Sequence, residues 1–139
     1  MEELIVEAFL CQIGCSNTEN FESVLNRLFL EDSANEFLLD LEQREYKDAI
    51  LHLNSLIDTC TFDKDLFGKI LMEKLRFLYS DMELAEFANK MYELWNLLPN
   101  SLAEENPFHI LSYADDCLSY GDEKQCQELY ERALKNYDN

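Results

Sequence analysis

The residues best suited to bind a metal ion or to attack a substrate are five cysteines and two histidines: Cys11, Cys15, Cys60, Cys117, Cys126, His52 and His109. Cys11 and Cys15 are four positions apart, so a helix would place both thiols on one face. A structural zinc site needs four such ligands, and neither histidine stands at ligand spacing from a second cysteine. No Cys-x-x-Cys pair occurs. The spacing therefore predicts reduced core thiols and no metal site.

Acid–base chemistry could come from the 29 aspartate and glutamate residues. The adjacent pairs Asp115-Asp116 and Glu104-Glu105 would point apart on a helix. A general acid needs a buried carboxyl group with a raised pKa, and nothing in the sequence marks one. These carboxylates are therefore interpreted as surface charge.

Sequence motifs of the common enzyme classes do not occur. The chain has no phosphate-binding loop, no Gly-x-Ser-x-Gly elbow and no His-Glu-x-x-His pair. A cysteine and a histidine that meet only in the fold could still form a nucleophile, but no spacing supports that alternative. We therefore predict that the chain is not an enzyme and binds no cofactor.

The elements that must position these residues are predicted to be helices. Only three glycines and two prolines occur, too few for the turns of a β-sheet protein. Apolar residues recur at helical intervals almost throughout, and no segment alternates with a period of two. The sequence predicts a single all-α domain over residues 1–139. Seven or eight helices would stack in it as antiparallel hairpins.

Helix ends are indicated by glycines and by capping residues. The first apolar stripe ends at Gly14, and Gly121 is the one strong C-terminal glycine signal. Capping boxes are expected at 16–19, 33–36 and 80–83. Each box would begin a helix.

The segment 106–121 is predicted to be one helix. Asn106 would be its N-cap and Pro107 its first residue, where a missing N–H costs nothing. Asp122 would then begin the last helix. Gly68 lies inside another predicted helix and costs it about 1 kcal/mol relative to alanine.

The chain is strongly acidic, with a formal net charge of −18 that is spread along its length. Such a field repels nucleic acid and anionic membranes and speeds encounter with a basic protein. The alternative is that acidity only keeps the protein soluble. The partner is therefore predicted to be another protein, basic in charge, and neither nucleic acid nor membrane.

Localisation is predicted from the apolar segments and the first residues. No stretch approaches the roughly 18 apolar residues of a membrane span. Met1 is followed by acids, where a secretory signal would carry bases. Both features, with the odd number of cysteines, predict a cytoplasmic protein.

Residues 107–139 have the spacing of large and small residues that suits two packed helices. The matching positions are Tyr113, Ala114, Cys117, Gly121, Asp122, Cys126, Tyr130 and Ala133. In this pattern the segment resembles one tetratricopeptide repeat. It departs from that family at Ile110, where a tryptophan is favoured, and in lacking the closing proline.

Upstream the match to the repeat is weaker. Tyr46, Ala49 and Leu53 resemble a second helix of the repeat, and so do Ala88, Tyr92 and Trp95. Armadillo- or HEAT-like packing, or an irregular helical bundle, remain alternatives. Tyr92 and Trp95 are interpreted as core, although an exposed Trp95 would be a candidate interface anchor.

The resemblance implies a protein-binding scaffold whose first helices line a groove. On that basis Phe108, Leu111, Asp115, Leu118 and Ser119 are predicted to line the groove and to bind the partner. Asp116 is added to these protein-binding residues, because reversing the charges of Asp115 and Asp116 should weaken a charge-driven complex.

Two functions are compatible with these features. The first is an acidic partner that neutralises or inhibits a basic protein, such as the immunity protein of a bacterial toxin. The alternative is a tetratricopeptide-like adaptor that holds a peptide or a helix in its groove. A charge-driven complex should depend steeply on salt, and a groove contact should depend on it less.

Overall fold

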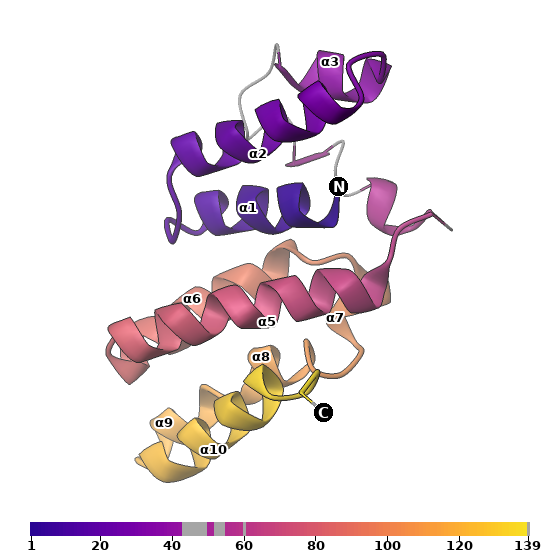
Figure 1. Cartoon of the computed structure of the whole chain (residues 1–139). Coiled ribbons are helices and arrows are strands. Elements are labelled where there is room, and N and C mark those ends of the chain that lie inside the picture. The colour runs from indigo at the N-terminus through magenta and orange to yellow at the C-terminus, as the bar shows by residue number, and fades with distance from the viewer. Residues whose placement is uncertain (43–49, 52–54, 60, 139) are drawn as a thin grey trace. The chain divides into compact units, whose positions relative to one another are not determined.

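The computed structural model describes residues 1–42, 50–51, 55–59 and 61–138 of the chain. These residues form nine helices and no strand (Figure 1), which confirms the all-α prediction. Contacts divide the chain into two compact units, Met1–Asp63 and Lys64–Asn139. The prediction of one domain over residues 1–139 stays a prediction.

The first unit contains α1 (Glu2–Gln12), α2 (Thr18–Glu31) and α3 (Glu36–Glu42). α1 and α2 pack as an antiparallel hairpin, and α3 packs on α2 (Figure 1). Three of the residues matched upstream to the repeat, Tyr46, Ala49 and Leu53, lie outside the described residues.

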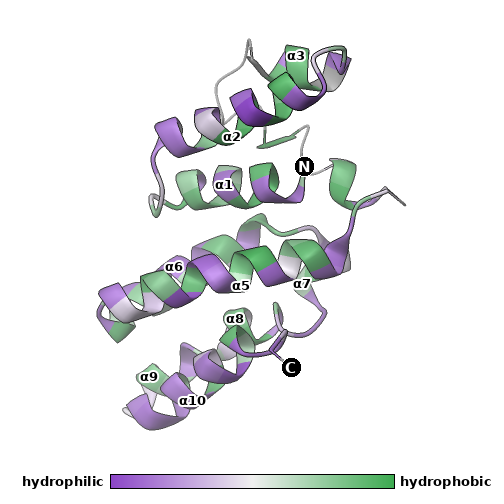
Figure 2. Cartoon of the chain, in the orientation of Figure 1, coloured by the Kyte–Doolittle hydropathy of each residue, from purple (hydrophilic) through white to green (hydrophobic). Residues whose placement is uncertain are grey.

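α1 is the most apolar of these helices, as the green ribbon in Figure 2 shows. It buries eight consecutive residues, from Leu4 to Cys11, so every side of the helix is covered. A helix that is apolar all round is expected to be buried all round. In the described part of the chain, no helix has the length and apolar character to traverse a bilayer.

The turn between α1 and α2 is closed by a glycine and an asparagine. Gly14 has φ of 77°, and the Cys15 N–H donates to the Leu10 carbonyl at 2.8 Å, as in a Schellman motif. The Asn17 side chain caps α2 by accepting from the Asn20 N–H at 2.9 Å. The N-cap is therefore Asn17, and the predicted capping box at 16–19, with Ser16 as its cap, is wrong.

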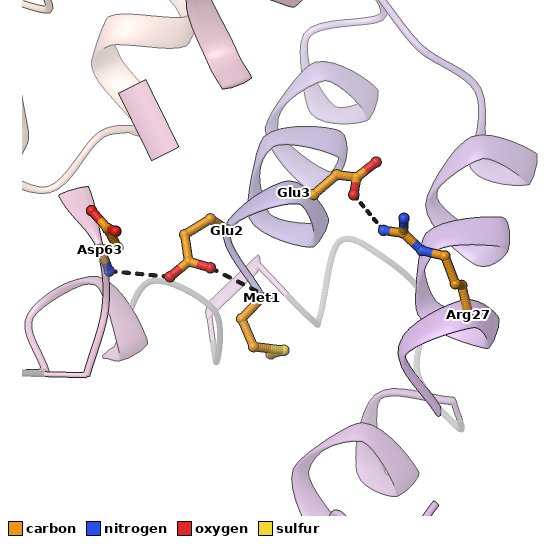
Figure 3. A network of polar contacts seen from close by, with 5 residues as sticks. All are labelled: Met1, Glu2, Glu3, Arg27 and Asp63. Carbon is orange, nitrogen blue, oxygen red and sulfur yellow. Dashed lines mark hydrogen bonds and ion pairs between the residues drawn. The ribbon is translucent and has the colours of Figure 1, made fainter. Parts of the chain in front are cut away.

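Three polar contacts anchor the start of α1 within its unit (Figure 3). Glu3 forms an ion pair with Arg27 of α2. The two oxygens of Glu2 reach the N–H of Asp63 at 3.1 Å and the amino group of Met1 at 3.6 Å. Exposed pairs of this kind contribute little stability, so they mainly orient the first turn.

The second unit contains six helices: α5 (Lys64–Asp81), α6 (Leu84–Leu97), α7 (Asn100–Ala103), α8 (Ile110–Tyr113), α9 (Asp116–Ser119) and α10 (Glu123–Leu134). α5 and α6 form an antiparallel hairpin (Figure 1). α10 packs against α5, α8 and α9, and α8 packs against α6.

The capping box predicted at 80–83 is wrong. α5 continues to Asp81, and the Ser80 hydroxyl donates back to the Phe77 carbonyl at 2.9 Å. Ser80 therefore lies inside α5 and is not the N-cap of α6. α6 begins after Glu83, which makes no side-chain cap hydrogen bond.

The single helix predicted over 106–121 is also wrong. The segment forms two helices of four residues, α8 and α9, and α8 begins only at Ile110. The N–H groups of Ile110, Leu111 and Ser112 donate to carbonyls three residues back. Such tight turns do not propagate into a long α-helix. Asp122, by contrast, caps the last helix as predicted.

Aromatic side chains fill the core of the second unit. The centroid of the Phe87 ring lies 5.1 Å from that of Tyr79 and 5.0 Å from that of Tyr130. Both contacts are edge to face, an arrangement that aromatic rings prefer. Phe67 lies 6.0 Å from Phe108. Tyr130 is completely buried, as expected for the aromatic position of the last hairpin.

Gly68 and Arg76 hold the C-terminal segment against α5. A Cβ atom at Gly68 would come within 2.0 Å of the Tyr137 hydroxyl oxygen, so the glycine lets this ring approach the helix. Arg76 donates to the Leu134 carbonyl at 2.8 and 3.1 Å and pairs with Asp138. A cation at these carbonyls complements the negative end of α10.

Candidate functional site

The six predicted protein-binding residues divide into two groups in the structure. Phe108 and Leu111 are 2% and 0% exposed and lie in the core, so a partner does not reach them in this conformation. Leu111 belongs to the short helix α8, which packs on α6 and α10, and Phe108 precedes that helix. Asp115 and Leu118 are partly exposed, and Asp116 and Ser119 are exposed.

The exposed residues gather where α9 turns into α10. We call residues 116–123 the α9–α10 corner. Tyr120, at the C-terminus of α9, is 84% exposed. Asp116, Ser119 and Tyr120 are three and four positions apart, so they share one face.

Sequence analysis did not identify Tyr120 as a binding residue. The signal was available, since an aromatic residue precedes a helix-ending glycine and stands four positions after an acid. An aromatic residue at the end of an apolar stripe is usually assigned to the core. Only the packing of α9 on α10 shows that this ring is left outside.

The backbone of the α9–α10 corner is fixed by its own hydrogen bonds. Gly121 has φ of 76°, and the Asp122 N–H donates to the Cys117 carbonyl at 2.9 Å. The Asp122 side chain accepts from the Gln125 N–H at 3.0 Å. The first two features form a Schellman motif at the end of α9, and the third is the N-cap of α10, directly after it. They present Tyr120 on a defined backbone.

The corner is acidic. Asp116, Asp122 and Glu123 are exposed, and no basic residue occurs between positions 116 and 123. Asp122 and Glu123 stand at the N-terminus of α10, where the helix dipole favours negative charge. An exposed aromatic ring beside three acids is suited to contact a basic protein.

Behind the corner lie polar groups without partners among the described residues. The Asp115 Oδ1 atom and the Tyr130 hydroxyl are buried and make no hydrogen bond. Burial raises the pKa of the Asp115 carboxyl, and the neighbouring charge of Asp116 adds to it. Burial also raises the pKa of Tyr130.

Two cysteines of the described residues, Cys11 and Cys126, have buried thiols. Burial raises the pKa of the Cys126 thiol to about 11, so the thiolate that would attack a substrate is scarce at neutral pH. Burial, with the nearby Glu7, also raises the pKa of Cys11. The described residues hold no group of three potential metal ligands. Cys60 and His52 lie outside them.

Two small cavities flank the C-terminal segment. They measure about 190 and 250 Å3 and share Arg76, Leu134 and Asp138 as lining residues. Both are below the roughly 300 Å3 at which ligand pockets begin. Arg76, the central polar group, is already bound to Leu134 and Asp138.

Comparison with known protein families, with curated proteins and with solved structures finds no match to this chain. The resemblance of residues 107–139 to a tetratricopeptide repeat stays a prediction. The function is therefore argued from the α9–α10 corner.

Proposed function

We propose that the chain is a non-catalytic protein-binding domain that neutralises or inhibits a basic protein, in the manner of a toxin immunity protein. The observation that carries the proposal is the α9–α10 corner. There Tyr120 is 84% exposed, and the acids Asp116, Asp122 and Glu123 surround it in sequence.

The two kinds of side chain at the corner have different roles in such a complex. The acids, with the formal charge of −18, attract a basic surface and raise the rate of encounter. Tyrosine is among the residues that most often dominate binding energy when an interface covers them. Tyr120 would supply affinity, and the acids would supply speed and selectivity.

A non-catalytic role is supported by the state of the nucleophilic candidates. The Cys126 thiol has its pKa raised to about 11, and the Cys11 thiol donates to the Asn17 carbonyl at 3.1 Å. Both thiols are buried. They are suited to packing.

An adaptor that uses a tetratricopeptide-like groove is the second candidate. Cys126, Tyr130 and Ala133 are all fully buried, which agrees with the small and aromatic positions of that repeat. The burial of Phe108 and Leu111 counts against it, because those residues would have to line the groove. The neutralising role is therefore the better supported of the two.

The experiment is to immobilise the chain, apply extract of its source cells, elute with a salt gradient and purify the protein retained. Calorimetry with that protein then compares wild type with Tyr120→Ala. We expect a basic partner released at moderate salt, and a loss of about 2 kcal/mol in binding for Tyr120→Ala.

Phe77→Ala is the matched control, because Phe77 is an aromatic residue on α5 that is 68% exposed. It should leave the affinity unchanged. A partner that is acidic, or one bound equally well by Tyr120→Ala, would contradict the proposed function.

A further inference from the structure

A second exposed aromatic group lies on α6, away from the α9–α10 corner in sequence. Tyr92 is 46% exposed, and its ring stacks on Trp95 with centroids 6.4 Å apart and planes inclined by 28°. The Trp95 indole N–H donates to the Ala103 carbonyl at 2.8 Å. That bond fixes the indole, so Tyr92 rests on a pre-oriented ring.

Two amide side chains share the exposed face of Tyr92. Asn89 and Asn96 stand three positions before and four positions after it, and both are exposed, so they lie on its side of the helix. Each offers an amide oxygen as a hydrogen-bond acceptor. Glu93, the next residue, points to another side, where its 54%-exposed side chain lies 3.7 Å from Lys90 Nζ.

We propose that Tyr92, backed by Trp95 and flanked by Asn89 and Asn96, is a seat for an arginine side chain of a basic partner protein. The proposal rests on the proposed function for the partner's positive charge. The side chains of the seat all belong to α6, and none lies in the α9–α10 corner.

Arginine fits this seat better than lysine does. A planar guanidinium group stacks on a tyrosine face and keeps its N–H donors at the rim, directed toward acceptors in the same plane. A lysine ammonium group is compact and strongly hydrated, and stacks less well. The net charge of −18 attracts either cation, so only the stacking distinguishes them.

The test uses Trp95, the only tryptophan in the chain, as a fluorescent reporter. The full chain is titrated with a short arginine peptide and with a lysine peptide of equal length, at matched ionic strength. We expect a saturable change in Trp95 emission, and about 2- to 5-fold tighter binding of the arginine peptide.

Substitutions of Tyr92 separate stacking from general charge attraction. Tyr92→Leu should abolish the preference for arginine, and Tyr92→Phe should retain it because the ring remains. Phe77→Ala, at an exposed aromatic residue of α5, is the control and should leave the preference unchanged. The proposed function is tested separately, by Tyr120→Ala with the natural partner.

Equal binding of the two peptides would overturn the arginine seat, as would a preference that survives Tyr92→Leu. An absent Trp95 response would overturn it too. None of these results would affect the α9–α10 corner. Conversely, if Tyr120→Ala did not weaken binding of the natural partner, the preference for the arginine peptide would be unaffected.

Discussion

Two helical corners of this chain have the same backbone design but differ in the side chains that they expose. Residues 13–20, the α1–α2 corner, and residues 116–123, the α9–α10 corner, each turn at a glycine with φ of 77° or 76°. Each closes with Schellman hydrogen bonds. Each then begins a helix with an Asn or Asp cap, Asn17 or Asp122.

The side chains of the two corners differ. At the α1–α2 corner the polar groups bind one another, since the Ser16 hydroxyl donates to the 4%-exposed Glu7 at 2.9 Å and the Cys11 thiol donates to Asn17. At the α9–α10 corner Tyr120 and three acids face solvent. The turn of the first unit therefore holds Ser16 and Cys11 by local hydrogen bonds, although residues 17–20 are exposed, and the turn of the second unit exposes an aromatic ring.

The largest effect on stability is expected from removing a core side chain of α10, the helix that follows the α9–α10 corner. Tyr130→Ala deletes a buried ring that meets Phe87 edge to face and should lower the free energy of unfolding by about 3–5 kcal/mol. Urea unfolding followed by Trp95 fluorescence measures it in the unit concerned. A loss below about 1 kcal/mol would contradict the packing described for α10.

Tyr130→Phe is the matched control for that measurement. It keeps the ring and removes a hydroxyl that has no hydrogen-bond partner among the described residues. The free energy of unfolding should therefore stay the same or rise slightly.

Removing one serine hydroxyl should lower the free energy of unfolding more at the α1–α2 corner than at the α9–α10 corner. Ser16→Ala removes the hydrogen bond to the buried Glu7 and should cost about 1.5–3 kcal/mol. Ser119→Ala, at the exposed position of the other corner, should change stability by less than about 0.5 kcal/mol. Amide hydrogen exchange in α1 and in α10 measures the change in stability of each unit separately. Equal costs at the two serines would break the comparison.

A smaller effect concerns pH. Burial raises the pKa of Asp115 in the folded state, so folding holds its proton more tightly than the unfolded chain does. Stability therefore falls as pH rises from the unfolded pKa of about 3.9 through the higher folded value.

Asp115→Asn should remove that fall, so that the variant is more stable than wild type at neutral pH and the difference closes below about pH 4. Thermal unfolding across this range measures it. Ser119→Ala, which changes no titratable group at an exposed position, is the control and should leave the slope unchanged. A slope unaltered by Asp115→Asn would show that the burial of this carboxyl has no energetic consequence.

The sequence predicts the backbone of both corners well, because Gly14 and Gly121 adopt a conformation that other residues avoid. Helical periodicity likewise indicates the all-α class. Capping boxes were less reliable, since a serine can bond to Glu7, as Ser16 does, or back into its own helix, as Ser80 does. Local pattern does not distinguish these partners.

The candidate site was only partly predictable. Asp116 and Ser119 are exposed as a binding role requires, but Phe108 and Leu111 are core residues and Tyr120 was missed. The expected long helix over 106–121 placed these residues on the wrong faces, because two four-residue helices turn side chains differently. Exposure at this corner is decided by how α9 packs on α10, which the spacing of apolar residues does not show.

The most direct test of the account is an amide chemical-shift map of the isotope-labelled chain on addition of the partner recovered by salt elution. The account predicts that shifts concentrate at residues 116–123 and that residues 13–20 stay unchanged. Shifts centred on residues 13–20, with none at Asp116 or Tyr120, would contradict the claim that the α9–α10 corner is the binding surface.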